Sequence, residues 1–197
     1  TWIASKGWFI GRFEKGFGDY IGAPHVTSVC NGTVAIHLAL EALGIGPGDE
    51  VIVPTFTYIA SVNTILQAGA KPVFVDSLES SWQIDPEDVQ RKITPRTKAV
   101  MVVPLYGLPC DMDAIGAICE QHKLLLVEDC AEAFGTRYKG RHVGTFGDIA
   151  TFSFFGNKTI TTGEGGMVVA KDIKTIQRAF HLKNQGVSQT REYWHDE

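Results

Sequence analysis

Short, uninterrupted apolar runs recur along the chain and are separated by segments rich in turn residues. Runs of this length, enriched in valine, isoleucine and phenylalanine, are typical of strands that are buried on both faces. Strands of this kind are typical of parallel sheets, which are usually covered on both sides, so we expect a mostly parallel sheet. The predicted strands are residues 51–54, 72–76, 99–104, 124–129, 149–154 and 166–170.

Segments with a helical spacing of apolar residues lie between several of these strands. At the start of one of them, Asp85 followed by Pro86 is typical of an N-cap residue with proline at the first helical position. Strand and helix alternate, which predicts a three-layer α/β/α fold with helices on both faces of the sheet. The predicted helices are residues 33–43, 59–68, 85–92 and 111–122.

Composition and charge exclude several classes of partner. The formal net charge is −4 and no run of lysine or arginine occurs, so we expect neither nucleic acid nor a membrane surface as a partner. No apolar stretch has the length of a membrane span, and four scattered cysteines without close pairs indicate neither a metal site nor a disulfide framework. We therefore expect a cytoplasmic protein. Since the chain begins at Thr1 and stops at Glu197 inside a polar segment, we also expect a fragment of a longer protein.

Residues that follow the predicted strands are the first candidates for function, because ligands of such sheets bind beyond the carboxyl ends of the strands. Asp129 ends a very apolar strand, where an unpaired carboxylate is costly and needs a cationic partner. The alternative for Asp129 is a helix-capping carboxylate. The other residues in such positions are Thr55, Asp76, Tyr106 and the segment 156–158.

Lys158 is the single lysine of a loop rich in glycine and threonine that follows a buried strand. Most lysines are solvated surface charges, but an amine in this setting is suited to attack a carbonyl group. Upstream, Asn31, Gly32 and Thr33 open a helix whose first amides are free to bind a phosphate, with ordinary helix capping as the alternative.

A phosphate site, a buried carboxylate and a lysine amine together are what an enzyme dependent on pyridoxal 5'-phosphate (PLP) requires. The helix start would hold the phosphate, Asp129 the pyridinium nitrogen, and Lys158 the aldehyde as a Schiff base. An aromatic ring against the cofactor is also expected. Phe56 or Tyr58 is positioned to supply it, although core packing is the simpler interpretation of Phe56.

Five segments, in this order, resemble the DegT-type nucleotide-sugar aminotransferases, a branch of the fold type I PLP enzymes. The resemblance covers nearly the whole chain. It implies that residues 1–197 form the PLP-binding large domain of such an enzyme, incomplete and without the smaller C-terminal domain of the family. The segments are residues 31–33, 44–54, 128–135, 147–158 and 162–166.

The resemblance also implies a role for each matching residue. Gly32 and Thr33 would bind the PLP phosphate, and Ser153 would add a hydroxyl to it from the strand before the lysine. Asp129 would pair with the pyridinium nitrogen.

Three further positions follow from the same resemblance. Lys158 stands where related sugar dehydratases have histidine, which favours amino transfer. Tyr58 falls where the family places an aromatic residue over the ring, and Glu132 where it has glutamine, histidine or glutamate near the ring hydroxyl. The segment 5–10 resembles a family loop near the sugar nucleotide, with an entry segment that packs its aromatic residues as the alternative.

Within the family, the segments 54–63 and 155–166 are most similar to enzymes that act on a GDP-linked 4-keto-6-deoxy sugar. This similarity implies glutamate as amino donor, surface polysaccharide synthesis, and a homodimer with shared active sites. Two alternatives stay open: an aminotransferase for a dTDP- or UDP-linked keto sugar, and a non-catalytic fragment that binds a ligand or a partner protein. A nucleotide-binding Rossmann module is disfavoured because no G-x-G-x-x-G segment links a predicted strand to a helix.

Overall fold

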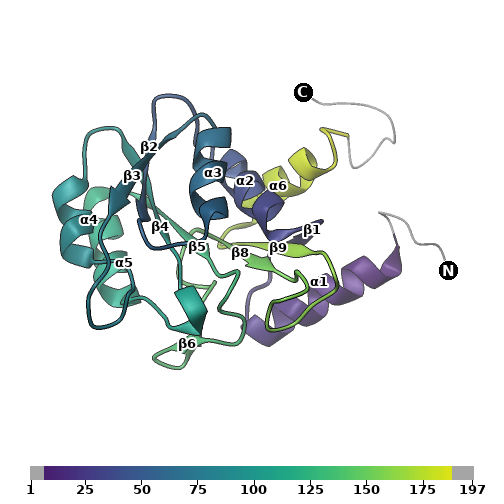
Figure 1. The fold of residues 1–197 in the computed structure, drawn as a ribbon. Helices are drawn as coiled ribbons and strands as arrows, with labels where there is room; N and C mark the ends of the chain where they lie inside the picture. The colour runs from purple at the N-terminus through teal and green to yellow at the C-terminus, as the bar shows by residue number, and fades with distance from the viewer. Residues whose placement is uncertain (1–6, 188–197) are drawn as a thin grey trace.

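The computed structural model describes residues 7–187 as an α/β fold built on a seven-stranded sheet (Figure 1). The strands of this sheet are β1 (Val26–Val29), β2 (Glu50–Pro54), β3 (Lys71–Val75), β4 (Thr97–Val102), β5 (Leu125–Asp129), β8 (Ile149–Ser153) and β9 (Gly166–Ala170). Their order is β1-β9-β8-β5-β4-β2-β3. The pairs from β8 to β3 are parallel, whereas β9 is antiparallel to both of its neighbours, β1 and β8.

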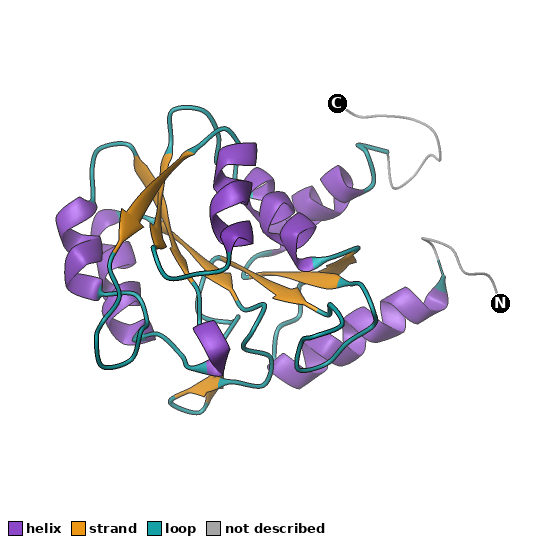
Figure 2. Ribbon diagram, viewed as in Figure 1, coloured by secondary structure: helices purple, strands orange, loops and turns teal. Residues whose placement is uncertain are grey.

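Helices cover both faces of the sheet (Figure 2). One layer holds α2 (Gly32–Ala42), α3 (Ile59–Gln67) and α6 (Ile173–Lys183), and the other holds α1 (Trp8–Ile21), α4 (Pro86–Lys92) and α5 (Met112–His122). A short 3-10 helix, η1 (Leu105–Gly107), follows β4. A two-stranded hairpin of β6 (Arg137–Tyr138) and β7 (Arg141–His142) connects β5 to β8.

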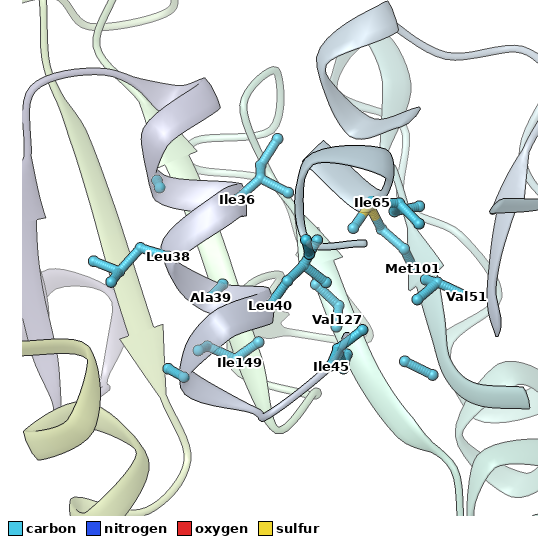
Figure 3. Packing of buried hydrophobic residues seen from close by; sticks show 14 of the residues in the cluster. Ile36, Leu38, Ala39, Leu40, Ile45, Val51, Ile65, Met101, Val127 and Ile149 are labelled. Carbon is cyan, nitrogen blue, oxygen red and sulfur yellow. The ribbon is translucent and has the colours of Figure 1, made fainter. Parts of the chain in front are cut away.

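The alternation of side chains along each strand decides which residues face which layer. Val127 and Ile149 belong to the core under α2 and α3, which Figure 3 shows together with Ile36, Leu40, Ile65 and Met101. Asp129 lies two residues beyond Val127, so its side chain points to the same face. Ser153, four residues beyond Ile149, does likewise.

Helix α2 sits close to the sheet because its inward face is rich in small residues. Ala35 and Ala39 are fully buried and bring the helix backbone near the strands. Asn31 begins the helix, since its side-chain oxygen accepts the Val34 N–H at 2.9 Å. The start of α2 is thereby fixed beside the carboxyl end of β8.

The predicted fold is confirmed: the sheet is mostly parallel and stands between two layers of helices. All six predicted strands and four predicted helices are present, with bounds that differ by at most two residues. The structure adds α1, β1, α6 and the β6–β7 hairpin, which the apolar pattern did not indicate. No helix between residues 7 and 187 has the length and apolar character needed to cross a bilayer.

For the segment 5–10, the interpretation as an entry segment that packs its aromatic residues is wrong. Its first two residues lie outside the described part of the chain, and Trp8 and Phe9 begin helix α1. Their rings stack on each other at 3.9 Å and both stay largely exposed, so they are not packed into the core.

Candidate active site

The candidate site lies at the carboxyl ends of β5 and β8, where α2 and α3 begin (Figure 1). Asp129 is the last residue of β5 and is buried. Its Oδ2 accepts the Ser61 hydroxyl at 2.6 Å, and its Oδ1 accepts the Ala131 N–H at 3.3 Å. The carboxylate is therefore held in one orientation by donors from α3 and from the turn after β5.

Burial raises the pKa of Asp129, because desolvation disfavours the charged form. The Ser61 hydroxyl, the Ala131 N–H and the positive charge of Lys158 act in the opposite direction, and the Glu132 carboxylate raises the pKa further. An acid in this setting is stabilised as an anion when a cationic group comes close to it. The site is thus suited to a ligand that presents an N–H⁺ group to Asp129.

Ser61 is a site residue that the sequence analysis did not single out. It is fully buried, and its oxygen lies 3.1 Å from the Thr57 hydroxyl. Since the only proton of Ser61 points to Asp129, Thr57 must be the donor in this second hydrogen bond. The sequence does contain a signal for this residue. Ser61 stands four residues before the buried Ile65 and so lies on the inward face of α3.

Lys158 lies in the loop after β8, where its N–H bonds to the Phe155 carbonyl at 3.0 Å. Its side chain is 17% exposed, and its Nζ lies 3.6 Å from Glu132 Oε1. The same Nζ lies 6.0 Å from the centre of the Tyr58 ring. The amine is thus flanked by a carboxylate and an aromatic face, and its charge also acts on Asp129.

Glu132 connects Lys158 to a strained turn. Its second oxygen, Oε2, accepts the Tyr106 N–H at 3.0 Å. Tyr106 has a φ of 56°, a left-handed conformation that is uncommon for residues other than glycine. Because both of its oxygens have partners, the Glu132 carboxylate is fixed beside the lysine amine.

The start of α2 meets the end of β8 in close contact. A methyl group added at Gly32 would lie 2.7 Å from the Ser153 Cβ, so only glycine allows this approach. Within residues 7–187, no acceptor is recorded for the N–H groups of Gly32 and Thr33. These two amides and the Ser153 hydroxyl form a group of donors to which an anion fits.

Some candidate residues lie apart from this group. The Thr55 hydroxyl donates to the Val75 carbonyl at 2.6 Å, and Asp76 accepts the N–H of Ser77, so both bind local backbone. Phe56 packs against Trp82, at 5.2 Å between ring centres. Of the two aromatic candidates, Tyr58 is thus the one whose ring lies beside Lys158.

Comparisons with known proteins identify the family of this chain. The model of the DegT/DnrJ/EryC1/StrS aminotransferase family matches residues 1–197. GDP-perosamine synthase of Escherichia coli O157:H7 is 59% identical over 196 residues, which are 100% of this chain and 54% of that protein. The chain spans about half the length of the curated relatives it matches.

Solved structures show the same fold. An aminotransferase from Psychrobacter cryohalolentis has a TM-score of 0.94 at 39% identity, over 97% of this chain and 51% of that one. NtdA from Bacillus subtilis, solved with bound cofactor PMP, has a TM-score of 0.91 at 30% identity, over 98% of this chain and 43% of that one.

Proposed function

We propose that this chain, which belongs to the DegT/DnrJ/EryC1/StrS aminotransferase family, is the large domain of a PLP-dependent sugar aminotransferase. The reaction proposed is transfer of an amino group from glutamate to a GDP-linked 4-keto-6-deoxy sugar, which gives GDP-perosamine. The substrate rests on the 59% identity to a GDP-perosamine synthase. The observation that carries the enzyme class is the gathering of Asp129, Lys158 and the Gly32–Ser153 contact at one edge of the sheet.

The residues at this edge fit PLP. Asp129 is a buried carboxylate whose bonded neighbours are donors, which suits it to accept a pyridinium N–H. The amides of Gly32 and Thr33 and the Ser153 hydroxyl suit a phosphate. Lys158 supplies the only kind of side chain that forms a Schiff base with an aldehyde.

Each group then has a task that follows from its position. Asp129 keeps a proton on the ring nitrogen, and bound PLP supplies an electron sink for the glutamate α-carbon. Lys158, as a neutral amine, accepts the proton from that α-carbon as general base. Glu132, at 3.6 Å, stabilises the ammonium that results, and Tyr58 offers an aromatic face beside it.

We infer a homodimer with shared active sites and a place in surface polysaccharide synthesis from the family resemblance. The cytoplasm is the inferred location because nucleotide sugars are made there and the four cysteines are free thiols.

The proposed reaction is tested with the intact protein, PLP, glutamate and GDP-4-keto-6-deoxymannose. We expect mass spectrometry to detect a GDP-linked 4-amino sugar and stoichiometric 2-oxoglutarate. The same assay with dTDP- and UDP-linked keto sugars is the control for the nucleotide. Preference for one of those would reject the GDP-sugar, and failure to take up PLP would favour a non-catalytic binding protein.

A second test concerns Ser61, which acts on Asp129 and not on the substrate. Ser61→Ala removes a hydroxyl that donates to a charged, buried acceptor, and such bonds are worth about 1.5–3 kcal/mol. We expect kcat to fall by about ten- to a hundredfold. Ser61→Thr keeps the hydroxyl and should restore most of the rate.

The readout beside kcat is PLP affinity, measured by fluorescence, with the folded state checked by circular dichroism. Weaker PLP binding in Ser61→Ala, with recovery in Ser61→Thr, distinguishes positioning of Asp129 from a general packing defect. Equal behaviour of the two variants would show that the hydroxyl is unimportant.

A further inference from the structure

Strand β1 forms one edge of the sheet and lies between two helices, with α6 packed on one face and α1 on the other (Figure 1). In the described part of the chain, β9 is the single strand that pairs with it. Backbone N–H and C=O groups on the outer side of such a strand need other partners. Through Cys30 and Asn31, the strand leads directly into the start of α2.

Ser28 of β1 receives these partners from both neighbouring helices. Its N–H donates to Glu14 Oε1 of α1 at 2.7 Å, and its hydroxyl donates to the same oxygen at 2.9 Å. Its carbonyl accepts a hydrogen bond from the Lys183 Nζ of α6 at 3.0 Å. The outer edge of β1 is thus closed at Ser28 by one side chain from each helix.

Glu14 and Lys183 also form an ion pair with each other. The Lys183 Nζ lies 3.6 Å from Glu14 Oε1, and the two side chains are 17% and 19% exposed, respectively. Burial lowers the pKa of Lys183, whereas the charge of Glu14 and the hydrogen bond to it raise that pKa. Because loss of either partner would leave the other charge poorly solvated, the two side chains hold Ser28 as one unit.

The peptide group between Asn31 and Gly32 carries one of the proposed phosphate donors, the Gly32 N–H. This peptide is closely packed on two sides. A methyl group added at Gly166 of β9 would lie 2.5 Å from the Asn31 carbonyl oxygen, and one added at Gly32 would lie 2.7 Å from the Ser153 Cβ. Ser28 stands only three residues before Asn31, so a shift of β1 along β9 would displace the peptide from both contacts.

We propose that Glu14 and Lys183 are positioning residues for the phosphate site at the start of α2. They act through Ser28 and the end of β1, by keeping the peptide between Asn31 and Gly32 in place beside β8 and β9. This inference rests on the proposed function, because it takes the phosphate of the cofactor as the ligand of the first α2 amides.

Two ligands that differ only in the phosphate group test the proposal: pyridoxamine 5'-phosphate (PMP) and pyridoxamine. Both lack the aldehyde and form no Schiff base with Lys158, so the ratio of their dissociation constants measures what the phosphate contributes to binding. Calorimetric titration of the intact, PLP-free protein should show PMP bound about a hundredfold or more tightly, as expected for several charge-assisted hydrogen bonds.

In Glu14→Ala, the preference for PMP should fall by about tenfold, the effect of one charge-assisted hydrogen bond, while pyridoxamine binds as before. Lys183→Met should lower the preference by about threefold, since Glu14 still accepts the Ser28 N–H. Glu14→Gln keeps an oxygen that can accept this N–H and should retain most of the preference. Circular dichroism checks that each variant is folded.

Asp19→Ala is the matched control, because Asp19 lies on the same helix as Glu14 but is exposed and pairs with Lys15 at 2.6 Å. An equal preference for PMP in Glu14→Ala and Asp19→Ala would overturn the inference. So would an equal loss of affinity for PMP and pyridoxamine in Glu14→Ala, since the whole site would then be loosened. Equal binding of both ligands by the unchanged protein would instead reject the phosphate site itself, and the proposed function would fail together with the inference.

Discussion

Lys158→Ala is expected to leave the protein folded but to end covalent attachment of PLP. Without the amine, borohydride reduction should no longer fix the cofactor to the chain, and mass spectrometry of the intact protein should show only its unmodified mass. Amino transfer should fall by about a thousandfold or more, since the same nitrogen also acts as general base. Folding is preserved because the side chain lies in a loop, outside the buried core.

Two controls separate chemistry from charge. Lys158→Arg keeps a cation beside Glu132 but has no nucleophilic amine, so it should be as inactive as the alanine variant. Lys171→Ala removes a lysine at the far end of the sheet and should leave attachment and turnover unchanged. If borohydride still fixed PLP in Lys158→Ala, another lysine would hold the cofactor and the proposed site would be wrong.

The amino-acid sequence predicted the parts of this site that depend on strand ends. Asp129 and Lys158 follow uninterrupted apolar runs, and such runs in a parallel sheet bring their carboxyl ends to one edge. The 29 residues that separate them in the chain therefore matter little. Gly32 was predictable too, since a helix that follows Asn31 and glycine offers free amides.

The partners of these residues depend on packing between elements, which the pattern of apolar residues does not specify. Ser61 reaches Asp129 because the first turn of α3 lies beside the end of β5, and Glu132 reaches Lys158 because the turn after β5 folds toward the loop after β8. The strained turn at Tyr106 is likewise visible only in three dimensions. Because Ser61, Glu132 and Tyr106 are single residues, a repeating pattern of apolar positions does not predict their contacts.

The missed elements have separate physical reasons. Helix α1 contains glycine at positions 11, 16 and 18, which lowers its intrinsic stability, so it depends on packing of Phe17 and Ile21 against the sheet. The antiparallel direction of β9 was open to inference, because the 12 residues between β8 and β9 contain no helix, whereas the connection between parallel strands usually does. An apolar run alone does not show its direction.

Asp129→Asn should lower the activity while it raises the stability of the PLP-free protein. Most substitutions of a buried residue do not change these two properties in opposite directions. The amide cannot keep a proton on the ring nitrogen as a carboxylate does, so we expect turnover to fall by about a hundredfold or more, while PLP stays attached to Lys158. The PLP-free protein should become more stable to urea by about 1–3 kcal/mol, because a buried charge is replaced by a neutral group.

The dependence on pH follows from the sign of the pKa shift. Because the pKa of Asp129 is raised above its ordinary 3.8 in the folded protein, ionisation costs stability at neutral pH, and this cost disappears as the pH falls below 3.8. The gain from Asp129→Asn should therefore be largest near neutral pH and vanish in acid. The amide also fits: it donates to Ser61, accepts from Ala131, and lets Ser61 donate to Thr57.

Asp88→Asn is the control with the opposite sign. Asp88 has as little exposed surface as Asp129, but the Asp76 N–H and Lys92 lower its pKa. Its charge therefore stabilises the fold above the ordinary pKa of 3.8, and this stabilisation is lost in acid. Asp88→Asn should destabilise the protein at neutral pH. Destabilisation by Asp129→Asn as well would mean that Lys158 already compensates the Asp129 charge in the absence of PLP. In that case the Asp129 carboxylate would stabilise the fold of the PLP-free protein, and its charge would not be kept solely to pair with the cofactor.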